Sequence, residues 1–533
     1  METLTPSPQG SGPSKVDVLE DPLLPLKYDG SSTPRMSARR LVRNAVVIIL
    51  LSGVIIAASW ILSTLPDPED GESEPKELYS PTITLIETQP LNYTIPKLPT
   101  SVETYSHELS LINSATSTIK VTVMYWSLLC RTPSDIPLGC TRGEAIYSAF
   151  SSAANRGVKI YFLQDASQNY TQLRDLAASN YNVEYRVWNA EEWYGNGIMH
   201  QKLWVVDGRN VYLGSSNMDW LSLSQVKELG VGISDSSVVG GIAEDMFDDW
   251  YDWAGREVET VTYFNSEYQL ELRAPCWTGH VEGQEGSCEY PFPVRKWTYN
   301  RKDQRSLKFN GNESSFFISR SPFEIASDGG YTEDLNGIIS TIRSAEVNVS
   351  ISVMDFLPTS SYDNAWFNKL QESLLTVWQG RGVTSKIMVS WWAYSDINMI
   401  KQMMNLVDQS DGGIEVGVYM MPGWNETNAT KGTQNVFPDH SRVAHGKFVV
   451  TEGRVNVGTS NFQWGYFYNT AGTSFNTDHE ETVRLVTQVF DRDWNCEYTM
   501  DVEEWWNLYG EQYEQVEVGG GGGGVQKYRR GEL

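Results

Sequence analysis

The chain has 533 residues, of which 40% are hydrophobic and 20% charged, and its formal net charge is −26. This length and composition can fill more than one apolar core and exclude an intrinsically disordered chain. The acidic balance disfavours a protein that coats duplex nucleic acid through a basic face. It leaves open an enzyme that draws one strand end into a local basic pocket.

The N-terminal region predicts one membrane anchor. Residues 1–44 are rich in Pro, Ser and Gly over most of their length and are expected to form a disordered cytosolic tail. Residues 45–65 form an uncharged apolar run, long enough to span a bilayer core of roughly 30 Å as a helix. Arginines cluster before this run and acidic residues follow it. The positive-inside rule therefore predicts a single-pass type II membrane protein with a lumenal catalytic body.

The covalent chemistry of the remaining chain suits a lumenal environment. Six glycosylation sequons lie beyond the apolar run, at Asn92, Asn169, Asn312, Asn348, Asn425 and Asn428. All five cysteines lie there too, and an oxidising lumen permits disulfides. The expected loop-closing pairs are Cys130 with Cys140 and Cys276 with Cys288, which leaves Cys496 unpaired.

Two long segments repeat the same order of elements. Residues 100–263 and 309–510 each run through a strand, an amphipathic helix, an Arg-Gly-Val turn, two strands and a hairpin. This alternation predicts the α/β fold class, and repeats of this length indicate a duplicated domain. Residues 66–99 are expected to form a lumenal stalk, residues 264–308 a connecting segment, and residues 511–533 a flexible Gly-rich tail.

The strongest motif occurs once in each repeat, in the form H-x-K-x4-[D/E]. The first copy contains His200, Lys202 and Asp207, and the second contains His445, Lys447 and Glu452. The four intervening residues are apolar in the first copy and largely apolar in the second, so both copies are expected to be strands, on which His and Lys share one face. The acidic residue and the Gly that follows it predict a hairpin turn.

The returning strands predict an amide beside each motif. They end in Gly-Ser-Ser-Asn217 and Gly-Thr-Ser-Asn461. Reflection through the turns places Asn217 near His200 and Asn461 near His445. Each repeat then offers one imidazole, one ammonium and one amide in a small patch.

This set of side chains, present twice, suits phosphodiester cleavage without a metal. One imidazole can attack phosphorus to form a phosphohistidine, and the second can protonate the leaving oxygen and then activate water. Lysines and amides can stabilise charge on the non-bridging oxygens. We expect no metal and no other cofactor, and an acidic pH optimum, because one of the two imidazoles must be protonated.

The pattern resembles the phospholipase D superfamily over roughly residues 100–505. The strings YLGSSNMDW (212–220), SLSQVKELGV (222–231) and AGTS (471–474), together with Glu452, are similar to its animal type II membrane branch. The resemblance implies two α/β/α-sandwich domains around a pseudo-twofold axis, with one shared active site. It also implies passage through the endoplasmic reticulum to the late endosome or lysosome.

The resemblance further implies roles for particular residues. His200 would be the nucleophile and His445 the acid/base, with the reverse assignment left open. Glu228 stands where family members place a carboxylate that orients an imidazole, and the family arrangement implies His445 as its partner. The equivalent stretch of the second repeat reaches Thr473 and Ser474, which carry hydroxyls instead.

Two enzymatic substrates and one inactive state remain open at this point. The branch contains lysosomal 5′-3′ exonucleases acting on single-stranded DNA and RNA, and phospholipase D or transphosphatidylase activity on lipid headgroups is also attributed to it. A catalytically inactive membrane scaffold is disfavoured by the intact motifs. The aromatic residues Tyr125, Trp126, Trp391 and Trp392 are candidate base-stacking side chains. The expected partners are single-stranded nucleic acid or phospholipid as substrate and the membrane through residues 45–65, with a homodimer left open.

Overall fold

The first sheet has eight strands in the order β2-β1-β10-β8-β7-β3-β5-β6. Its strands are β1 (Thr82–Thr88), β2 (Val102–Glu103), β3 (Thr118–Val123), β5 (Lys159–Asp165), β6 (Val183–Trp188), β7 (Leu203–Val206), β8 (Asn210–Gly214) and β10 (Glu228–Ser234). The pairs β1–β2, β3–β5 and β5–β6 are parallel, and the remaining neighbours are antiparallel.

The second sheet runs β13-β14-β21-β20-β19-β16-β17-β18-β22, with β15 beside β14. Its strands are β13 (Arg305–Phe309), β14 (Asn312–Ser321), β15 (Thr332–Glu333), β16 (Asn348–Val353), β17 (Thr384–Trp391), β18 (Ile414–Met420), β19 (Lys447–Thr451), β20 (Val455–Gly458), β21 (Gly472–Thr477) and β22 (Thr499–Asp501). From β15 to β18 the order and the direction of every pairing match those from β2 to β6.

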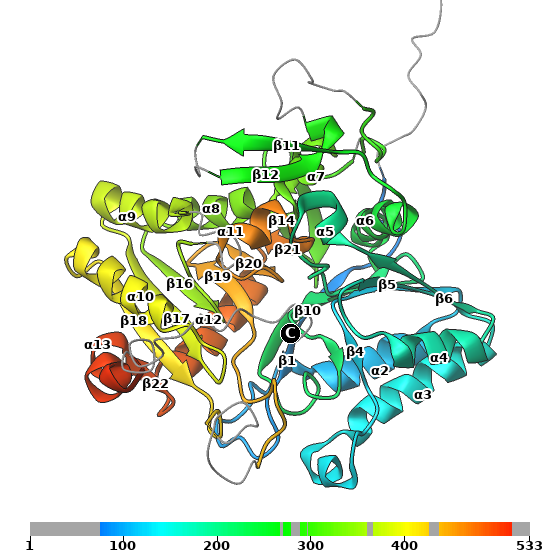
Figure 1. The fold of residues 1–533 in the computed structure, drawn as a ribbon, viewed down its shortest axis with the longest axis horizontal. Helices are drawn as coiled ribbons and strands as arrows, with labels where there is room; N and C mark the ends of the chain where they lie inside the picture. Colours follow the sequence, from blue (N-terminus) through cyan, green and yellow to red (C-terminus); the bar gives the residue numbers. More distant parts are fainter. Residues whose placement is uncertain are drawn as a thin grey trace, which may run out of the picture. The chain divides into compact units, whose positions relative to one another are not determined.

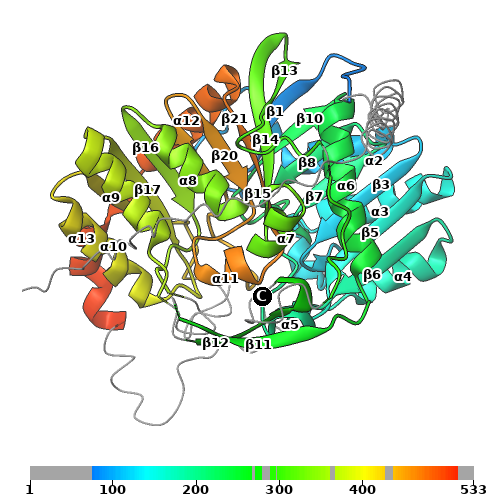
Figure 2. The same ribbon diagram turned by 90° about the horizontal axis from the view of Figure 1, so that it is seen from above.

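Helices cover both sheets, and two small strand pairs lie outside them. The helices used below are α2 (Thr104–Ser114), α3 (Thr141–Asn155), α4 (Thr171–Ser179), α5 (Ala190–Tyr194), α6 (Ser237–Trp253), α7 (Phe323–Asp328), α8 (Asp334–Ser344), α9 (Lys369–Arg381), α10 (Ile397–Ser410), α11 (Trp464–Tyr468), α12 (Glu480–Trp494) and α13 (Val502–Trp505). The small pairs are β4 (Trp126–Ser127) with β9 (Met218–Asp219), and β11 (Thr260–Asn265) with β12 (Leu270–Pro275). Figure 1 shows the β11–β12 hairpin at the top, and Figure 2 shows the same ribbon from above.

This computed structural model describes residues 75–266, 270–278, 288–295, 297–359, 366–425 and 436–513. They belong to one compact unit that begins at Glu74. No helix within these ranges is both long and apolar enough to cross a bilayer. The predicted tail 1–44 and anchor 45–65 lie outside the described residues.

Strand alternation explains the layers. On β7, Leu203 and Val205 join the core that contains residues of α6, whereas Trp204 and Val206 join the core that contains α2 and α3. Successive side chains of a strand point to opposite faces, so a strand that is apolar at every position must be covered on both. The second sheet is also covered on both faces, with α12 contributing to one core and α8, α9 and α10 to the other.

The N-terminal boundary of the first sheet corrects the sequence prediction. Residues 66–99 were expected to form a stalk, but β1 lies within them and pairs along its whole length with β10. Leu85 and Ile86 of β1 are buried on opposite faces. The prolines and acidic residues that predict a stalk end just before this strand, and its β-branched composition suits a central position.

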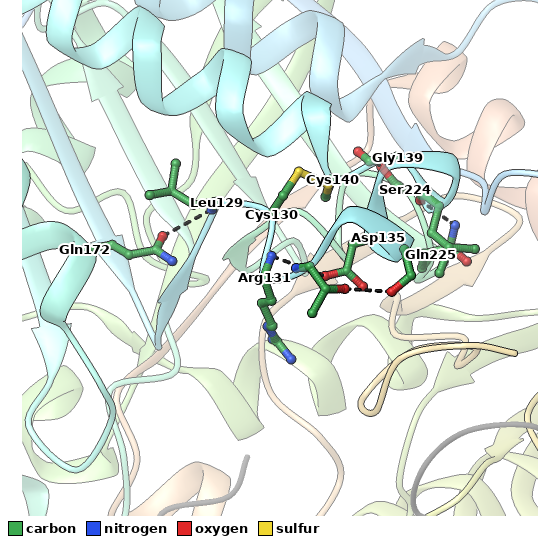
Figure 3. The surroundings of a disulfide bond; sticks show 12 residues. Leu129, Cys130, Arg131, Asp135, Gly139, Cys140, Gln172, Ser224 and Gln225 are labelled. Atoms are coloured by element: carbon green, nitrogen blue, oxygen red, sulfur yellow. Dashed lines mark hydrogen bonds between the residues drawn. A yellow bond between two sulfur atoms is a disulfide. The ribbon is translucent and has the colours of Figure 1, made fainter. Parts of the chain in front are cut away.

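Both predicted disulfides are present, and Cys496 is free. The Cys130–Cys140 bridge closes a loop that contains the short 3-10 helix Pro133–Leu138. Figure 3 shows this loop against residues 224–225, where the Ser224 hydroxyl donates to the Gly139 carbonyl at 3.0 Å and the Gln225 amide donates to the Leu138 carbonyl at 2.7 Å. The loop thus supports the segment that leads into Glu228 at the start of β10.

The sequons are accessible where they are described. Asn92, Asn169, Asn312, Asn348 and Asn425 are exposed, while Asn428 lies outside the described residues. Exposure is a requirement for a glycan, and glycosylation itself stays a prediction.

The two sheets are joined by a buried group of four charges. The ammonium of Lys227 lies 2.7 Å from the Asp493 carboxylate and 3.4 Å from that of Glu87. Arg492 pairs with both acids, at 2.9 Å with Asp493 and closely with Glu87. Glu87 lies on β1 and Lys227 directly precedes β10, whereas Arg492 and Asp493 lie on α12. Removal of one member would leave buried charge uncompensated.

We predict that Lys227→Ala destabilises the protein by about 3–5 kcal/mol, because two buried carboxylates then share one cation. Urea unfolding at neutral pH measures this difference, and Lys159→Ala, which removes an exposed lysine of β5, is the matched control. Equal unfolding midpoints for the two variants would show that the four-charge group contributes nothing to the stability of the packing between the two sheets.

Candidate active site

The two predicted histidines face each other between the sheets. The ring centroids of His200 and His445 are 6.4 Å apart and the ring planes are nearly perpendicular, at 77°. His200 is 3% exposed and His445 8%. The structure therefore brings together two residues that are 245 positions apart in the sequence.

Backbone pairing across the halves fixes both histidines. Met199 pairs with Ala471, and the His200 N–H donates to the Ala471 carbonyl at 2.9 Å. In the same way Ala444 pairs with Lys227, and the His445 N–H donates to the Lys227 carbonyl at 2.7 Å. Each imidazole is thus held by the chain segment that precedes the inner strand, β21 or β10, of the other sheet.

Glu228 supplies the carboxylate partner of one imidazole. Its Oε2 atom lies 2.9 Å from Nδ1 of His445 and accepts a hydrogen bond from the Ser215 hydroxyl at 2.5 Å. Glu228 is 1% exposed. The predicted pairing of Glu228 with His445 is confirmed. A carboxylate on Nδ1 directs Nε2 into the site and stabilises the protonated ring.

The second half has no equivalent carboxylate, and its counterpart position differs from the one predicted. Glu228 pairs with Thr88 on β1, and the residue at the same register on β21 is Gly472, opposite Ser321. A Cβ atom at Gly472 would lie 2.6 Å from the Ser460 hydroxyl and 2.7 Å from that of Ser321, so a side chain there would have to displace both hydroxyls.

The predicted hydroxyls serve other partners. Thr473 donates to the Ser319 carbonyl, and Ser474 donates to Asp334 at 2.6 Å. Neither orients His200, and among the described residues no acidic side chain hydrogen-bonds to the ring of His200. The two imidazoles are therefore unequally supported, as the sequence predicts. The counterpart of Glu228, however, is Gly472 and not Thr473 or Ser474.

The two motif lysines take the same position in each half. Lys202 Nζ donates to the His200 carbonyl at 3.0 Å, and Lys447 Nζ donates to the His445 carbonyl at 2.5 Å. Both side chains are 2% exposed or less. These contacts leave further N–H donors on each ammonium for an anionic ligand.

The second asparagine is part of a network that reaches His200. Asn461 donates to the Asp355 carboxylate at 3.1 Å and to the Tyr466 hydroxyl at 3.2 Å. Tyr466, on α11, meets the His200 ring edge-on at a centroid distance of 5.0 Å. Asn461 is thus linked through Tyr466 to the histidine of the other half, a connection that the reflection does not predict.

The first asparagine, Asn217, is linked through Ser222 to a second buried acid, Asp219. The Asn217 N–H donates to the Ser222 hydroxyl at 3.2 Å, and the Ser222 N–H donates to Asp219 at 2.8 Å. The Tyr125 hydroxyl also donates to Asp219, at 3.0 Å. Tyr125 and Asp355 occupy the same position after β3 and β16, so the two halves place a phenol and a carboxylate in corresponding places.

Several of these residues were not found from the sequence. Asp165 ends β5, where its carboxylate accepts the Met199 N–H at 2.5 Å, and Asp355 follows β16. Both stand at the carboxyl end of a parallel strand, which is a signal for site residues in α/β sheets. Asp219 and Tyr466 carry no such signal.

Two predicted members of the catalytic set lie elsewhere. Asp207 accepts four hydrogen bonds at 2.7–2.9 Å from the backbone and side chain of residues 116–118, and Glu452 accepts from the Glu346 and Asn348 N–H groups at 2.5 and 3.3 Å. A strand rises about 3.3 Å per residue, so these turn residues stand far from the imidazoles at the other end of β7 and β19. They stabilise the hairpins and do not contact the site.

The aromatic residues proposed for base stacking belong to the cores. Trp126 packs on Phe162 at 4.9 Å, and Trp391 on Trp505 at 4.4 Å. Trp126, Trp391 and Trp392 are at most 6% exposed, and the half-buried Tyr125 donates its hydroxyl to Asp219. The prediction is wrong for the three tryptophans, because these strand-end side chains pack into the cores.

Burial governs the protonation of the site. It lowers the pKa of His445 to about 4, although the Glu228 carboxylate acts upward and Lys447 acts further downward. Burial also lowers the pKa of His200 well below its usual range, with Lys202 and Lys447 adding to the effect. The pKa of Lys447 falls to about 7 for the same reason, against the upward influence of Glu228 and Asp355.

Within the described part of the chain, no three or more His, Cys, Asp and Glu side chains gather in a manner suited to a metal ion. Metal independence stays a prediction.

Comparison with known proteins assigns this arrangement to a family. A family model described as "Cardiolipin synthase, PLD-like domain" matches residues 109–250. Phospholipase D Z of Dictyostelium discoideum is 30% identical over 412 residues, which cover 76% of this chain and 88% of that protein. The chain belongs to the phospholipase D family. This confirms the resemblance inferred from the motifs.

Other members of the phospholipase D family carry a different activity in their names. The 5′-3′ exonuclease PLD3 of Xenopus tropicalis is 29% identical over 406 residues, which cover 73% of this chain and 74% of that protein. The 5′-3′ exonuclease PLD4 of Mus musculus is 28% identical over 417 residues, which cover 74% of each chain. As a member of the phospholipase D family, the protein is a phosphodiesterase hydrolase.

We predict that Glu228→Gln lowers kcat by on the order of 10²-fold or more, because the amide cannot stabilise a protonated His445. Since Glu228 raises the pKa of His445, the variant should also titrate His445 at a lower pH than the parent, as followed by NMR of the imidazole. Glu184→Gln, at an exposed position of β6, is the control. Parental turnover in Glu228→Gln would remove Glu228 from the catalytic arrangement.

We predict that kcat/KM falls as the pH rises through about 7. Lys447 is cationic below its pKa of about 7 and neutral above it, so its attraction for a phosphodiester is lost on the alkaline side. Bis(p-nitrophenyl) phosphate is a suitable substrate because its own charge is constant over this range. In Lys447→Arg the guanidinium stays charged, and any activity that this variant retains should not show the alkaline fall. A parental rate that climbs steadily from about pH 5 to about pH 8 would contradict the assignment.

Proposed function

We propose that this protein is a metal-independent 5′-3′ exonuclease that acts on single-stranded DNA or RNA through a phosphohistidine intermediate. The observation that carries the proposal is the pair of buried imidazoles, of which one is held by a carboxylate and the other is not. The exonuclease names of relatives that match about three quarters of the chain favour nucleic acid as the substrate.

The unequal surroundings assign the two roles. His200 has a strongly lowered pKa, so its neutral, nucleophilic form predominates. It attacks phosphorus as the P–O bond to the leaving group breaks, and His445 gives that oxygen a proton. Water then attacks phosphorus and transfers a proton to His445 as the P–N bond breaks, which releases a phosphomonoester and free His200. Glu228 stabilises His445 in its protonated state, and a bound phosphate would act in the same direction.

The lysines and amides would stabilise the negative charge on the non-bridging phosphate oxygens. Lys202 and Lys447 would bind the non-bridging oxygens with the ammonium hydrogens that the backbone carbonyls leave free. Asn217 would donate from one side, whereas the Asn461 amide already donates to Asp355 and Tyr466 and would hold these two side chains in place. Two buried cations in place of a metal ion are consistent with the pH dependence predicted above.

We further propose that the two sheets arose by duplication and are related by a pseudo-twofold axis. The identical strand order and the reciprocal pairing of Met199 with Ala471 and of Ala444 with Lys227 support this. The first repeat then begins at β1 rather than at residue 100. We also keep the type II anchor at residues 45–65 and a lysosomal destination as proposals, which the exposed sequons and the disulfides support.

A phospholipase D activity on lipid headgroups is the second candidate. It is favoured by the name of the relative from Dictyostelium discoideum, and the same two imidazoles could perform it.

A paired assay separates the two candidates. We predict that the purified chain, in excess chelator at acidic pH, shortens a 5′-hydroxyl single-stranded oligonucleotide from its 5′ end and releases no choline from phosphatidylcholine vesicles. His200→Ala should abolish the activity, which excludes a contaminating nuclease. Choline release without oligonucleotide shortening would replace the proposal with the second candidate, and cleavage that needs an added divalent ion would disprove the mechanism.

A further inference from the structure

A cavity of about 390 Å3 lies beside the active site. It is lined by α5, α7, α11 and the β11–β12 hairpin, which spans the end of the first repeat and the start of the connecting segment. Its lining includes Asn196, Arg273, Phe323, Lys369, Tyr468 and Asn469. Its volume falls in the range of small-molecule sites.

The cavity and the catalytic residues share two chain segments. Asn196 lines the cavity and lies four residues before His200, so their Cα atoms are at most about 14 Å apart. On α11, Tyr468 lines the cavity, whereas Tyr466 of the same helix contacts the ring of His200. A short oligonucleotide bound at His200 is therefore long enough to reach the cavity.

One wall is an aromatic column that ends at the cavity. The ring of Phe323 stacks on Tyr468 at 5.7 Å and 17°, and Tyr468 stacks on Trp464 at 5.2 Å and 14°. Phe323 is partly exposed, and within the described part of the chain Tyr468 is the ring on which it stacks. The column can be extended by one more flat ring at Phe323.

The other walls are polar and carry balanced charge. Arg273 and Lys369 are offset by the carboxylates of Glu271 and Glu324, and the amides of Asn196, Asn265 and Asn469 add donors and acceptors beside the apolar Leu272 and Ala274. A lipid acyl chain has no polar group that could use these donors, acceptors and charges. A nucleobase has a flat face for the column and an edge of donors and acceptors for amides and carboxylates.

We propose that this cavity binds a nucleobase of the single-stranded substrate, from a nucleotide other than those joined by the cleaved bond, and that Phe323 provides its stacking surface. The inference rests on the proposed nuclease function and adds a recognition subsite to it. The β11–β12 hairpin then acts as a substrate-binding element and not only as a connection between the repeats.

The test compares a substrate that reaches the cavity with one that does not. Phe323→Ala should raise KM for a single-stranded oligonucleotide roughly 5- to 150-fold, the range expected for one lost base stack, with kcat little changed. The same variant should cleave bis(p-nitrophenyl) phosphate at the parental kcat/KM, and Phe323→Tyr should restore oligonucleotide binding. Phe264→Ala is the control, because it removes a phenylalanine ring that is 61% exposed on β11 and does not line the cavity.

A second measurement needs no variant. In a series of oligonucleotides, one abasic nucleotide is placed at successive positions from the 5′ end. The parental enzyme should bind least tightly the oligonucleotide whose abasic nucleotide falls at the cavity. Equal KM values at every position, with cleavage intact, would overturn the subsite and leave the nuclease function standing. If the parental enzyme does not cleave the oligonucleotide at all, the proposed function fails and the subsite with it.

Discussion

The reciprocal backbone pairing between the two sheets is the constraint on which the active site depends. The segment that ends at His200 hydrogen-bonds to Ala471, and the segment that ends at His445 hydrogen-bonds to Lys227. A change in the separation of the sheets would alter both imidazoles together. The shared apolar core and the ion pairs of Lys227, Glu87, Arg492 and Asp493 hold that separation. The charged group includes Lys227, which directly precedes Glu228. The same short segment at the start of β10 therefore stabilises the packing of the two sheets and positions the Glu228 carboxylate.

Burial also determines the electrostatics of the site. Two ammonium groups and two imidazoles are withdrawn from water, which lowers the pKa of Lys447 and of both histidines. A neutral imidazole is a better nucleophile than a protonated one, and a desolvated ammonium interacts more strongly with an incoming phosphate than a hydrated one. Burial thus weakens the charge of the empty site and strengthens its interaction with an anion.

Much of the site could be predicted because its members stand at fixed spacings in strands. H-x-K places His and Lys on one face, the turn after it returns an Asn to the same end, and Glu228 lies at a spacing that the family uses for an imidazole partner. The role of Asp207 and Glu452 was misjudged because membership of a motif does not place a residue in the site. Both lie at the far end of their strands, where they satisfy backbone N–H groups. The contact between Tyr466 and His200, and the counterpart position Gly472, depend on how the two sheets meet. No local pattern contains that information, and β1 was missed for the related reason that its partner β10 is remote in sequence.

The absence of a side chain at Gly472 has a consequence for how a polymer can enter. If both histidines had a carboxylate partner, either could protonate a leaving oxygen, and a strand could lie across the site in both directions. With Glu228 beside His445, the proposed mechanism has the leaving oxygen face His445 and the phosphorus face His200. A nucleic acid strand has distinct 5′ and 3′ sides at every phosphate, so under the proposed nuclease function one asymmetric pair of imidazoles would select which of the two ester bonds is cleaved.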